Sequence, residues 1–329
     1  MRAMIVREFG GPEQMSVEEV PAPDPRPGEV VIEARAIGVN FPDLMVVEGS
    51  YQILPEPPFS PGKEVAGVVR AVGSEVSGLE VGERVMAQVE YGAYREQVLA
   101  SAAHTTPLPD NVSFEEGAAF GLAYLTVYFA LVRRAQLQPG ETVLVTGAAG
   151  GVGSAGVQLA KALGAKVIAV GSTEEKRALA LEVGADHAIE SDPGTFKEHV
   201  FELTDGHGAD VVLESVGGDL FSACMRAIAW EGRLVVIGFA SGEIPTVKAG
   251  RVLVKNMTLI GLQSSDYRER EPETLREAQE ALLDLYNRRK INVHVTATYP
   301  LEEAAEALKV IQSGQVRGKV VLTTDEASS

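Results

Sequence analysis

A single cysteine, Cys224, occurs among the 329 residues. One cysteine excludes an internal disulfide bond and any cysteine-rich zinc site. Cys224 lies in the helical stretch FSACMRAIAW, where we expect it to be a small buried hydrophobic residue. The N-terminal residues MRAMIVREFGG contain no secretory apolar stretch, because Arg7 and Glu8 interrupt them. A cytoplasmic protein is therefore expected.

Positive charge is also scarce. The chain has 29 lysines and arginines against 46 aspartates and glutamates, so its formal net charge is −17. This charge argues against nucleic acid and anionic membranes as partners, because phosphates favour Lys and Arg. No apolar run reaches the roughly 18 residues of a membrane-spanning helix. The five histidines are scattered and form no metal-binding spacing.

What the sequence does contain predicts two domains, since 329 residues are too many for one small core. Residues 1–115 hold short β-branched runs broken by glycine, proline and charged turns. Ser113 and Glu116 then form a capping-box pattern ahead of an apolar helix. From there, short apolar strands alternate with helices, which is typical of a doubly wound parallel sheet. The six expected strands are TVLVTG, KVIAV, HAIE, ADVVLESVG, GRLVVIG and NMTLIGL.

A glycine-rich loop follows the first of these strands and opens a helix. Gly151, Gly153 and Gly156 fit the pattern G-x-G-x-x-G of dinucleotide-binding folds, with Val152 between the first two. In that setting Gly151 allows a tight turn, Gly153 lets the backbone approach a pyrophosphate, and Gly156 packs the helix on the strand. The alternative is a tight structural turn without a ligand.

The end of the second strand indicates which dinucleotide binds. NAD sites usually place Asp or Glu there to bind the ribose hydroxyls, whereas this strand ends AVGST with Gly171 at that position. Ser172, Lys176 and Arg177 are close enough to meet a 2′-phosphate, which favours NADPH. Alternatively, Ser172 caps the next helix through a capping box with Glu175, and the two cations form a solvated helix face.

These motifs, in this order, resemble the medium-chain dehydrogenase/reductase superfamily and, within it, the zinc-free quinone oxidoreductases. The stretches that carry the resemblance include PRPGEVVIEARAIGVNFPDLMVVEGSY, PFSPGKEVAGVVRAVGSEV, AAFGLAYLTVYFAL, VLVTGAAGGVGSAGVQLAKALGAKVIA, GRLVVIG and GKVVL. The resemblance implies an α/β protein with two domains and an active site in the cleft. A GroES-like β-domain is expected at residues 1–115, completed by 266–329, and a Rossmann domain with a doubly wound parallel sheet at 116–265.

The sequence departs from the zinc-dependent alcohol dehydrogenases of that superfamily. Those enzymes carry Cys where this chain has Asn40 and His where it has Lys63. Asn and protonated Lys cannot replace the roughly three protein ligands of a catalytic zinc. We therefore expect no metal. Lys63 either contacts an oxyanion or pairs with a neighbouring carboxylate.

Hydride transfer without a metal requires an acceptor that is already electrophilic, such as a quinone or a conjugated enone or enal. Tyr51 matches the cleft tyrosine of the family, and its hydroxyl is a candidate proton donor; otherwise it is a packing tyrosine. The amide of Asn40 is a candidate to bind substrate or cofactor, or else it supports a turn. The resemblance places further cofactor contacts at Thr126, which otherwise bonds its own preceding helical turn, and at Lys319. Candidate contacts to the nicotinamide half follow the carboxyl ends of two strands, where ligands bind in such sheets: Ser215, Val216, Gly217, Phe239 and Ala240.

The expected function is an NADPH-dependent quinone or enone reductase with a small-molecule electrophile as substrate. Two alternatives remain: a reductase of 2-enoyl thioesters, and a non-catalytic NADPH-binding protein of the crystallin type. The resemblance also implies a homodimer joined through the last Rossmann strand, Asn256 to Leu262, because an apolar edge strand needs a cover.

Overall fold

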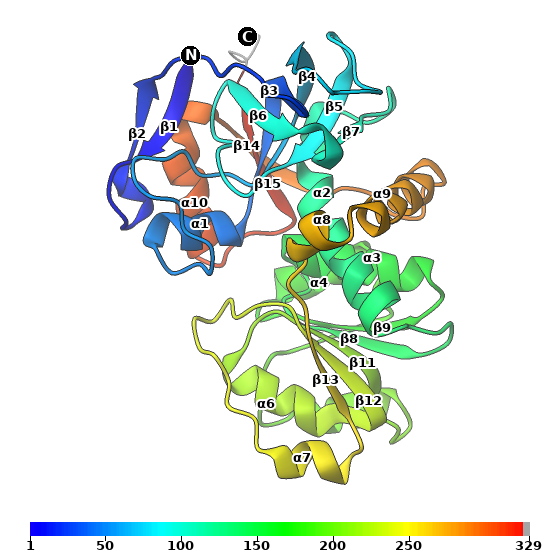
Figure 1. Cartoon of the computed structure of the whole chain (residues 1–329). Helices are drawn as coiled ribbons and strands as arrows, with labels where there is room; N and C mark the ends of the chain where they lie inside the picture. The colour runs from blue at the N-terminus through cyan, green and yellow to red at the C-terminus, as the bar shows by residue number, and fades with distance from the viewer. Residues whose placement is uncertain (325–329) are drawn as a thin grey trace. The chain divides into compact units, whose positions relative to one another are not determined.

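The computed structural model describes residues 1–324. The chain forms two compact units, one made of residues 1–122 and the segment from Val293 on, the other of residues 123–292 (Figure 1). The boundaries expected from the sequence, at residues 115 and 265, lie earlier than both of these. Within residues 1–324, no helix combines the length and the apolar character that crossing a membrane requires.

The first unit is built around a seven-stranded sheet with the order β14-β15-β3-β4-β5-β7, and β6 pairs with β3. Its strands are β3 (Glu29–Val39), β4 (Glu64–Val72), β5 (Arg84–Gln88), β6 (Gln97–Ser101), β7 (Thr105–Pro107), β14 (Val295–Pro300) and β15 (Lys319–Thr323). The C-terminal strand β15 pairs with β3, so the two ends of the chain complete one sheet. This arrangement confirms the expected GroES-like β-domain.

Smaller elements of the same unit cover this sheet. Strands β1 and β2 form a two-stranded antiparallel ribbon, and helices α1 and α10 contact each other. These elements are β1 (Arg2–Val6), β2 (Met15–Glu19), α1 (Phe41–Glu48) and α10 (Ala304–Gln312), with single-turn helices η1 (Pro12–Gln14), η2 (Ala102–His104) and η4 (Leu301–Glu303). Buried aliphatic residues from the strands and both helices form a single core in this unit.

The second unit contains the expected doubly wound sheet. Six parallel strands have the order β10-β9-β8-β11-β12-β13, the order of a dinucleotide-binding fold. The strands are β8 (Thr142–Val145), β9 (Lys166–Val170), β10 (His187–Ile189), β11 (Ala209–Glu214), β12 (Ile228–Val236) and β13 (Thr258–Gly261). Each lies within or close to a run predicted from the sequence. Strand β13 stands at one edge, as the sequence predicts for the last strand.

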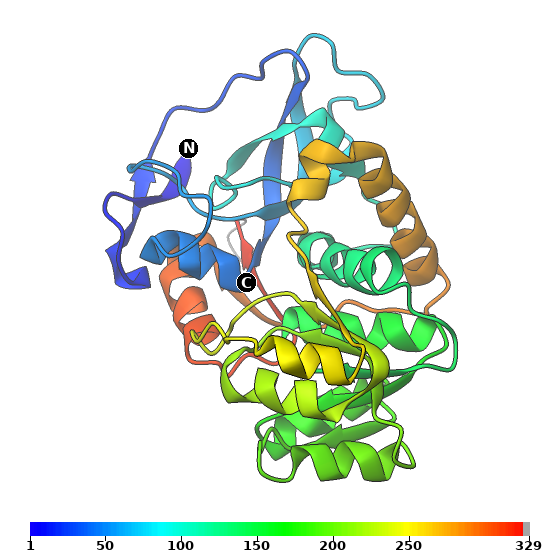
Figure 2. The ribbon, with the colours of Figure 1, turned by 60° about the horizontal axis from the view of Figure 1, so that its bottom comes forward.

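Helices lie on both faces of this sheet (Figure 2). Those that pack against its strands are α3 (Gly151–Ala162), α4 (Glu174–Glu182), α5 (Phe196–Leu203) and α6 (Gly218–Ala227). The other helices are α2 (Phe114–Tyr128), α7 (Ala249–Val254), α8 (Asp266–Arg270) and α9 (Pro272–Asn287). The capping box of Ser113 and Glu116 is present, since each side chain accepts the other residue's backbone N–H. A π-helical turn, η3 (Phe129–Arg134), extends α2 and was not predicted.

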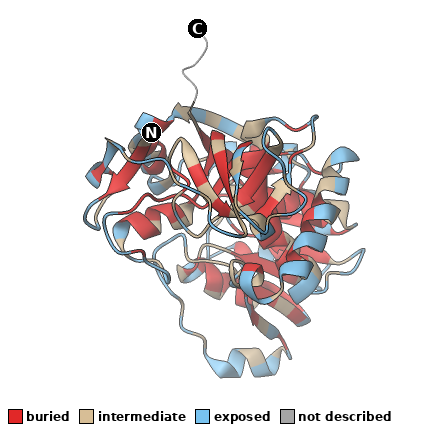
Figure 3. Ribbon diagram, turned by 45° about the horizontal axis from the view of Figure 1, so that its top comes forward, coloured by how far each residue is buried: buried red, intermediate tan, exposed pale blue. Residues whose placement is uncertain are grey.

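Most strand residues are buried, and the helices are buried in part (Figure 3). In the second unit, residues of α5 and α6 pack on the sheet in one hydrophobic cluster that includes Phe196, Phe221 and Cys224. Cys224 is fully buried, and this burial raises the pKa of its thiol. The expectation that Cys224 is a small buried hydrophobic residue is confirmed.

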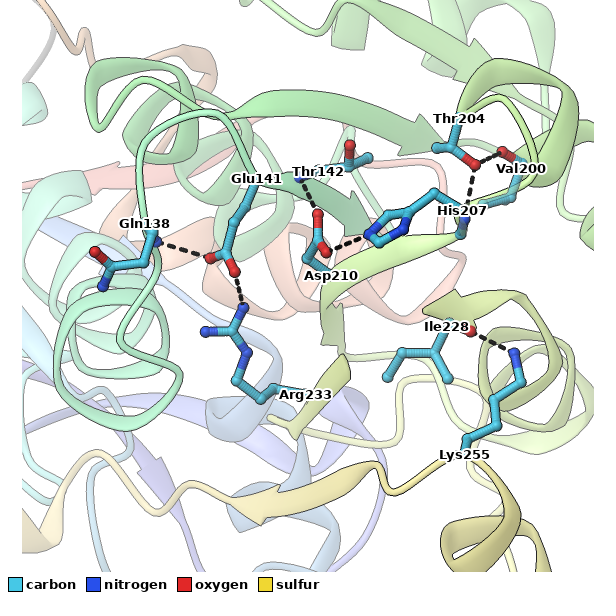
Figure 4. A network of polar contacts seen from close by, with 11 residues as sticks. Gln138, Glu141, Thr142, Val200, Thr204, His207, Asp210, Ile228, Arg233 and Lys255 are labelled. Carbon is cyan, nitrogen blue, oxygen red and sulfur yellow. Dashed lines mark hydrogen bonds and ion pairs between the residues drawn. The ribbon is translucent and has the colours of Figure 1, made fainter. Parts of the chain in front are cut away.

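Hydrogen bonds and an ion pair connect the amino-terminal ends of the Rossmann strands (Figure 4). The Asp210 carboxylate accepts the backbone N–H of Thr142 at 2.8 Å, and its other oxygen lies 2.7 Å from Nε2 of His207. Arg233 forms an ion pair with Glu141 on the neighbouring segment. These contacts fix the end of the sheet opposite to the one where ligands bind in such folds.

Candidate functional site

The glycine-rich loop lies between β8 and α3. Gly147 has φ of +59°, and its carbonyl accepts the N–H of Gly150 at 2.9 Å, so the tight turn is made here. The expectation that Gly151 makes this turn is wrong, because Gly151 is already the first residue of α3. Among the described residues, no side chain caps α3 at Gly150. The first-turn N–H groups of Gly151 and Val152 therefore suit an anion.

The other two glycines of the motif make room for neighbouring parts of the fold. A Cβ at Gly153 would lie 2.1 Å from the carbonyl oxygen of Gly147, so this glycine admits the backbone of the loop itself. A Cβ at Gly156 would lie 2.9 Å from the side chain of Leu213 on β11. Gly156 therefore packs the helix on the sheet, as expected. Gly153 supports the turn that a phosphate would approach.

The loop after β11 lies beside the glycine-rich loop. The N–H of Ser215 donates to the Thr146 hydroxyl at 3.0 Å, and the Ser215 hydroxyl donates to the Thr146 carbonyl at 3.3 Å. A third segment joins them, because the N–H of Ala240 donates to the carbonyl of Ser215. The structure thus gathers five of the predicted residues at the carboxyl ends of adjacent strands. These are Ser215, Val216, Gly217, Phe239 and Ala240.

Glu214 holds this loop in place, and sequence reasoning missed it. Its fully buried carboxylate accepts the N–H groups of Val216 and Gly217 at 2.9 and 3.0 Å. Burial raises the pKa of Glu214, and these hydrogen bonds oppose the rise. A carboxylate that ends an apolar strand, followed by the small residues SVGG, is the signal that could have identified it.

The residues predicted to meet a 2′-phosphate lie at the end of β9 and at the start of α4. A Cβ at Gly171 would lie 3.1 Å from Cγ of Arg177. Any residue with a side chain at position 171 would therefore press against the Arg177 side chain. The Arg177 guanidinium donates to the Gly171 carbonyl and pairs with Glu190 at 3.1 Å. Nζ of Lys176 donates to the Ser172 hydroxyl at 3.2 Å, which brings these two predicted residues together.

The capping box expected for Ser172 and Glu175 does not form. Helix α4 begins one residue later, and its N-cap is Thr173, whose hydroxyl accepts the N–H of Lys176. Thr173 takes the role because its extended backbone directs the hydroxyl at the first turn. The Ser172 hydroxyl does not cap the helix and instead accepts a hydrogen bond from the Lys176 ammonium.

Thr126 lies on α2, apart from this loop cluster in sequence. Its hydroxyl lies 3.0 Å from that of Ser264, in the segment that follows β13. Thr126 is buried in the second unit. The hydroxyl thus contacts another segment, in addition to any bond to its own preceding helical turn.

In the first unit, Asn40 and Lys319 meet around Glu64. The Asn40 amide donates to Glu64 Oε1 at 2.9 Å and to the Gly38 carbonyl at 3.3 Å, while Nζ of Lys319 donates to Asn40 Oδ1 at 2.5 Å. Lys319 also pairs with Glu64 at 2.7 Å. Both N–H bonds of the amide are thus engaged, and its carbonyl oxygen already accepts the Lys319 ammonium. Asn40 also stands at the N-cap of α1, in line with the alternative that it supports a turn.

Lys63 forms the second cluster of this unit. Its Nζ atom pairs with the Glu90 carboxylate at 2.6 Å, which confirms the expected pairing with a neighbouring carboxylate. The same ammonium lies 4.4 Å from the centroid of the Tyr51 ring. Tyr51 is half-buried, and Lys63 is 3% exposed.

Asp43 adds a buried carboxyl group beneath these residues. Its Oδ2 accepts the N–H of Asn40 at 2.9 Å and the Tyr94 hydroxyl at 3.1 Å, whereas Oδ1 has no hydrogen-bond partner among the described residues. Complete burial raises the pKa of Asp43 to about 7, although the charge of Lys63 opposes the rise. Sequence reasoning did not single out this residue.

The predicted site residues therefore fall into groups in both units. Asn40, Tyr51 and Lys319 belong to the first unit, and the remaining candidates belong to the second. Within residues 1–324, no group of three or more His, Cys, Asp or Glu side chains is placed to hold a metal ion.

Known proteins resemble the chain along nearly its whole length. The family models "Alcohol dehydrogenase GroES-like domain" and "Zinc-binding dehydrogenase" match residues 26–110 and 151–280. The quinone oxidoreductase-like protein 2 homolog of Nematostella vectensis is 38% identical over 332 residues, covering 99% of this chain and 89% of the relative.

Solved structures agree with this similarity. A mycobacterial protein complexed with NADPH superposes with a TM-score of 0.93 at 36% identity, covering 98% of this chain and 100% of that chain. The quinone oxidoreductase of Escherichia coli complexed with NADPH gives a TM-score of 0.92 at 34% identity, with the same coverage of both chains. With its GroES-like unit, its doubly wound sheet and this similarity, the chain belongs to the quinone oxidoreductase-like family of the medium-chain dehydrogenases/reductases.

Proposed function

We propose that the chain is an NADPH-dependent, zinc-independent reductase that transfers hydride to a quinone or to a conjugated enone or enal. The observation that carries the proposal is the state of the two positions where zinc-dependent relatives hold their ligands. At one, the Asn40 amide directs both N–H bonds at oxygens, and at the other, a buried Lys63 ammonium pairs with Glu90. Hydrogen-bond donors repel a cation, so these residues do not suit zinc.

The second unit offers suitable groups for the pyrophosphate, the 2′-phosphate and the nicotinamide half of NADPH. The uncapped start of α3 suits the pyrophosphate, and Lys176 with Ser172 suits a 2′-phosphate at the end of β9. Gly171 lacks the carboxylate that would repel that phosphate. The backbone of Ser215, Val216 and Gly217, held by Glu214, offers a rigid surface for the nicotinamide half. The similarity to structures complexed with NADPH supports this assignment.

When bound, NADPH supplies a hydride from its nicotinamide ring. The reduced quinone or enone must also gain one proton. We assign this proton to the Tyr51 hydroxyl, which exchanges with solvent afterwards. A ligand that bonds to the Asn40 amide would share its carbonyl oxygen with the Lys319 ammonium.

The proposed enzyme is a cytoplasmic homodimer. Strand β13 leaves one edge of the sheet with N–H and C=O groups that the sheet does not pair, which an isologous partner strand would cover. Exposed apolar side chains in the segment between β12 and β13 support the idea: Ile244, Leu253 and Val254 are each at least 75% exposed.

Consumption of NADPH in the presence of benzoquinone, naphthoquinones, small enals and crotonyl-CoA tests the function. We expect turnover with quinones or enals, and a large loss of activity in Tyr51→Phe. Turnover restricted to crotonyl-CoA would favour the thioester reductase instead. Saturable NADPH binding without turnover on any of these acceptors would favour a non-catalytic binding protein.

Dialysis against a chelator tests the metal. We expect unchanged turnover, because neither position carries a zinc ligand. Stoichiometric zinc in the purified protein, with activity lost on its removal, would contradict the proposal.

A further inference from the structure

Lys63 carries a charge into the interior of the first unit, where an ammonium is costly unless it is paired. The residue stands just before β4, and Glu90 just after the antiparallel strand β5. The N–H of Val89 donates to the Lys63 carbonyl at 2.9 Å, which ties the two strand ends together. Lys63 and Glu90 are therefore held opposite each other by the sheet and not by a flexible loop.

The bonds of this ammonium are directed. Nζ donates to the Glu90 carbonyl at 2.7 Å and to the Glu90 carboxylate at 2.6 Å. An ammonium has three N–H bonds, and these two acceptors use two of them. The centroid of the Tyr51 ring lies 4.4 Å from Nζ, within the range of a cation–π contact.

We propose that Lys63 is a positioning residue for Tyr51: its ammonium, anchored on Glu90, holds the face of the phenol ring and orients the hydroxyl. The role of Tyr51 as proton donor rests on the proposed function, whereas the contact itself does not. Tyr51 follows the end of α1 in a segment rich in proline, and its ring packs against the hydrophobic core of this unit. Lys63 adds a charged contact from the sheet.

The same contact makes Tyr51 sensitive to charge. A cation beside the ring favours the phenolate, and the Glu90 carboxylate on the far side of the ammonium opposes this effect. The other charged groups of the buried network are Asp43, whose pKa responds to both Lys63 and Glu64, and the Glu64–Lys319 pair. Replacing Lys63 by a neutral residue and replacing Glu90 by a neutral residue must therefore change the acidity of the Tyr51 phenol in opposite directions.

Titration of the Tyr51 phenol by NMR tests this relationship on the full chain without any turnover. Tyrosines labelled with ¹³C at Cζ give eight signals, and Tyr51→Phe identifies the relevant one. We expect Lys63→Met to lower the acid dissociation constant of Tyr51 by about three- to tenfold. Glu90→Gln should raise it by a similar factor, and Lys63→Arg should keep it near the wild-type value.

Arg2→Met is the matched control, since it removes a cation of the same unit whose ion pairs are with Glu96 and Glu302. This variant should leave the Tyr51 titration unchanged. An unchanged titration in Lys63→Met, or shifts of the same sign in Lys63→Met and Glu90→Gln, would overturn the inference. If Lys63→Met does not fold, the direction of the Glu90→Gln shift decides alone. Absence of reductase activity would refute the proposed function but leave this titration valid.

Discussion

The Nζ atom of Lys319 lies 2.7 Å from Oε1 of Glu64, and both side chains are almost fully buried. Lys319→Met should cost about 3–5 kcal/mol in the free energy of unfolding, because it leaves a buried carboxylate without its counter-charge. Urea denaturation measures this loss. Lys309→Met, which removes an exposed ion pair with Glu306, is the control and should change stability little. Equal stability of the two variants would show that the buried pair contributes nothing.

Two glycines of the phosphate loop should respond differently to the same substitution. A Cβ at Gly153 would lie 2.1 Å from the Gly147 carbonyl, whereas a Cβ at Gly150 would lie 3.4 Å from it. Gly153→Ala should therefore displace the loop and weaken NADPH binding at least about tenfold, a change of about 1.4 kcal/mol. Gly150→Ala should keep most of the affinity. Calorimetric titration of both variants decides, and a similar affinity for the two would contradict the assigned packing role.

Lys176 should set the cofactor preference. Lys176→Ala is expected to weaken NADPH by roughly 1–3 kcal/mol and NADH far less, because only NADPH carries the phosphate that this ammonium would meet. Glu190→Gln should act in the opposite direction, since it releases Arg177 from its ion pair. Fluorescence titration with both nucleotides provides the measurement. Equal weakening of NADPH and NADH in Lys176→Ala would refute the assignment.

Asp43 should make stability fall as pH rises. Its pKa in the folded chain is about 7, against 3.8 for the unperturbed group, so the folded state binds the extra proton between these values. Stability contributed by this group is full below about pH 4 and is lost by about pH 7, with a total of up to about 4 kcal/mol. Asp43→Asn should flatten this slope in urea denaturation from pH 5 to 7.5. The same slope in both proteins would show that Asp43 ionises normally.

The edge strand β13 should join two chains. Leu259→Pro removes a ladder donor and should split or unfold the dimer, and Leu253→Glu, on the exposed face of α7, should weaken it without disturbing the sheet. Light scattering at micromolar concentration tests both variants. A wild-type mass near 34.9 kDa, that of a single chain, would contradict the proposed dimer.

The Rossmann strands could be predicted from the sequence because each is a continuous apolar run between turn residues. Strand β14 was not predicted, since its alternating residues VTATYP carry no such run and it depends on pairing with β15. The phosphate loop followed from glycine spacing, but the turn lies at Gly147, which the motif does not include. Asp43 and Glu90 could not be predicted as site residues, because their roles depend on burial and on partners distant in sequence, Tyr94 and Lys63. Glu214 could have been identified, since its partners Val216 and Gly217 follow it directly.

The place of β15 in the sheet has a consequence for biosynthesis. The second unit is one continuous stretch, residues 123–292, so every strand and helix that it needs is present once residue 292 has left the ribosome. Asn40 and Glu64, in contrast, cannot bond to Lys319 until more than 250 further residues have been synthesised. The unit whose strands are synthesised first is thus the last to be completed. Until then, residues 36–39 of β3 lack their partner strand β15 and the Glu64 carboxylate lacks its counter-charge. Chaperone dependence of the nascent chain should therefore centre on its first 122 residues.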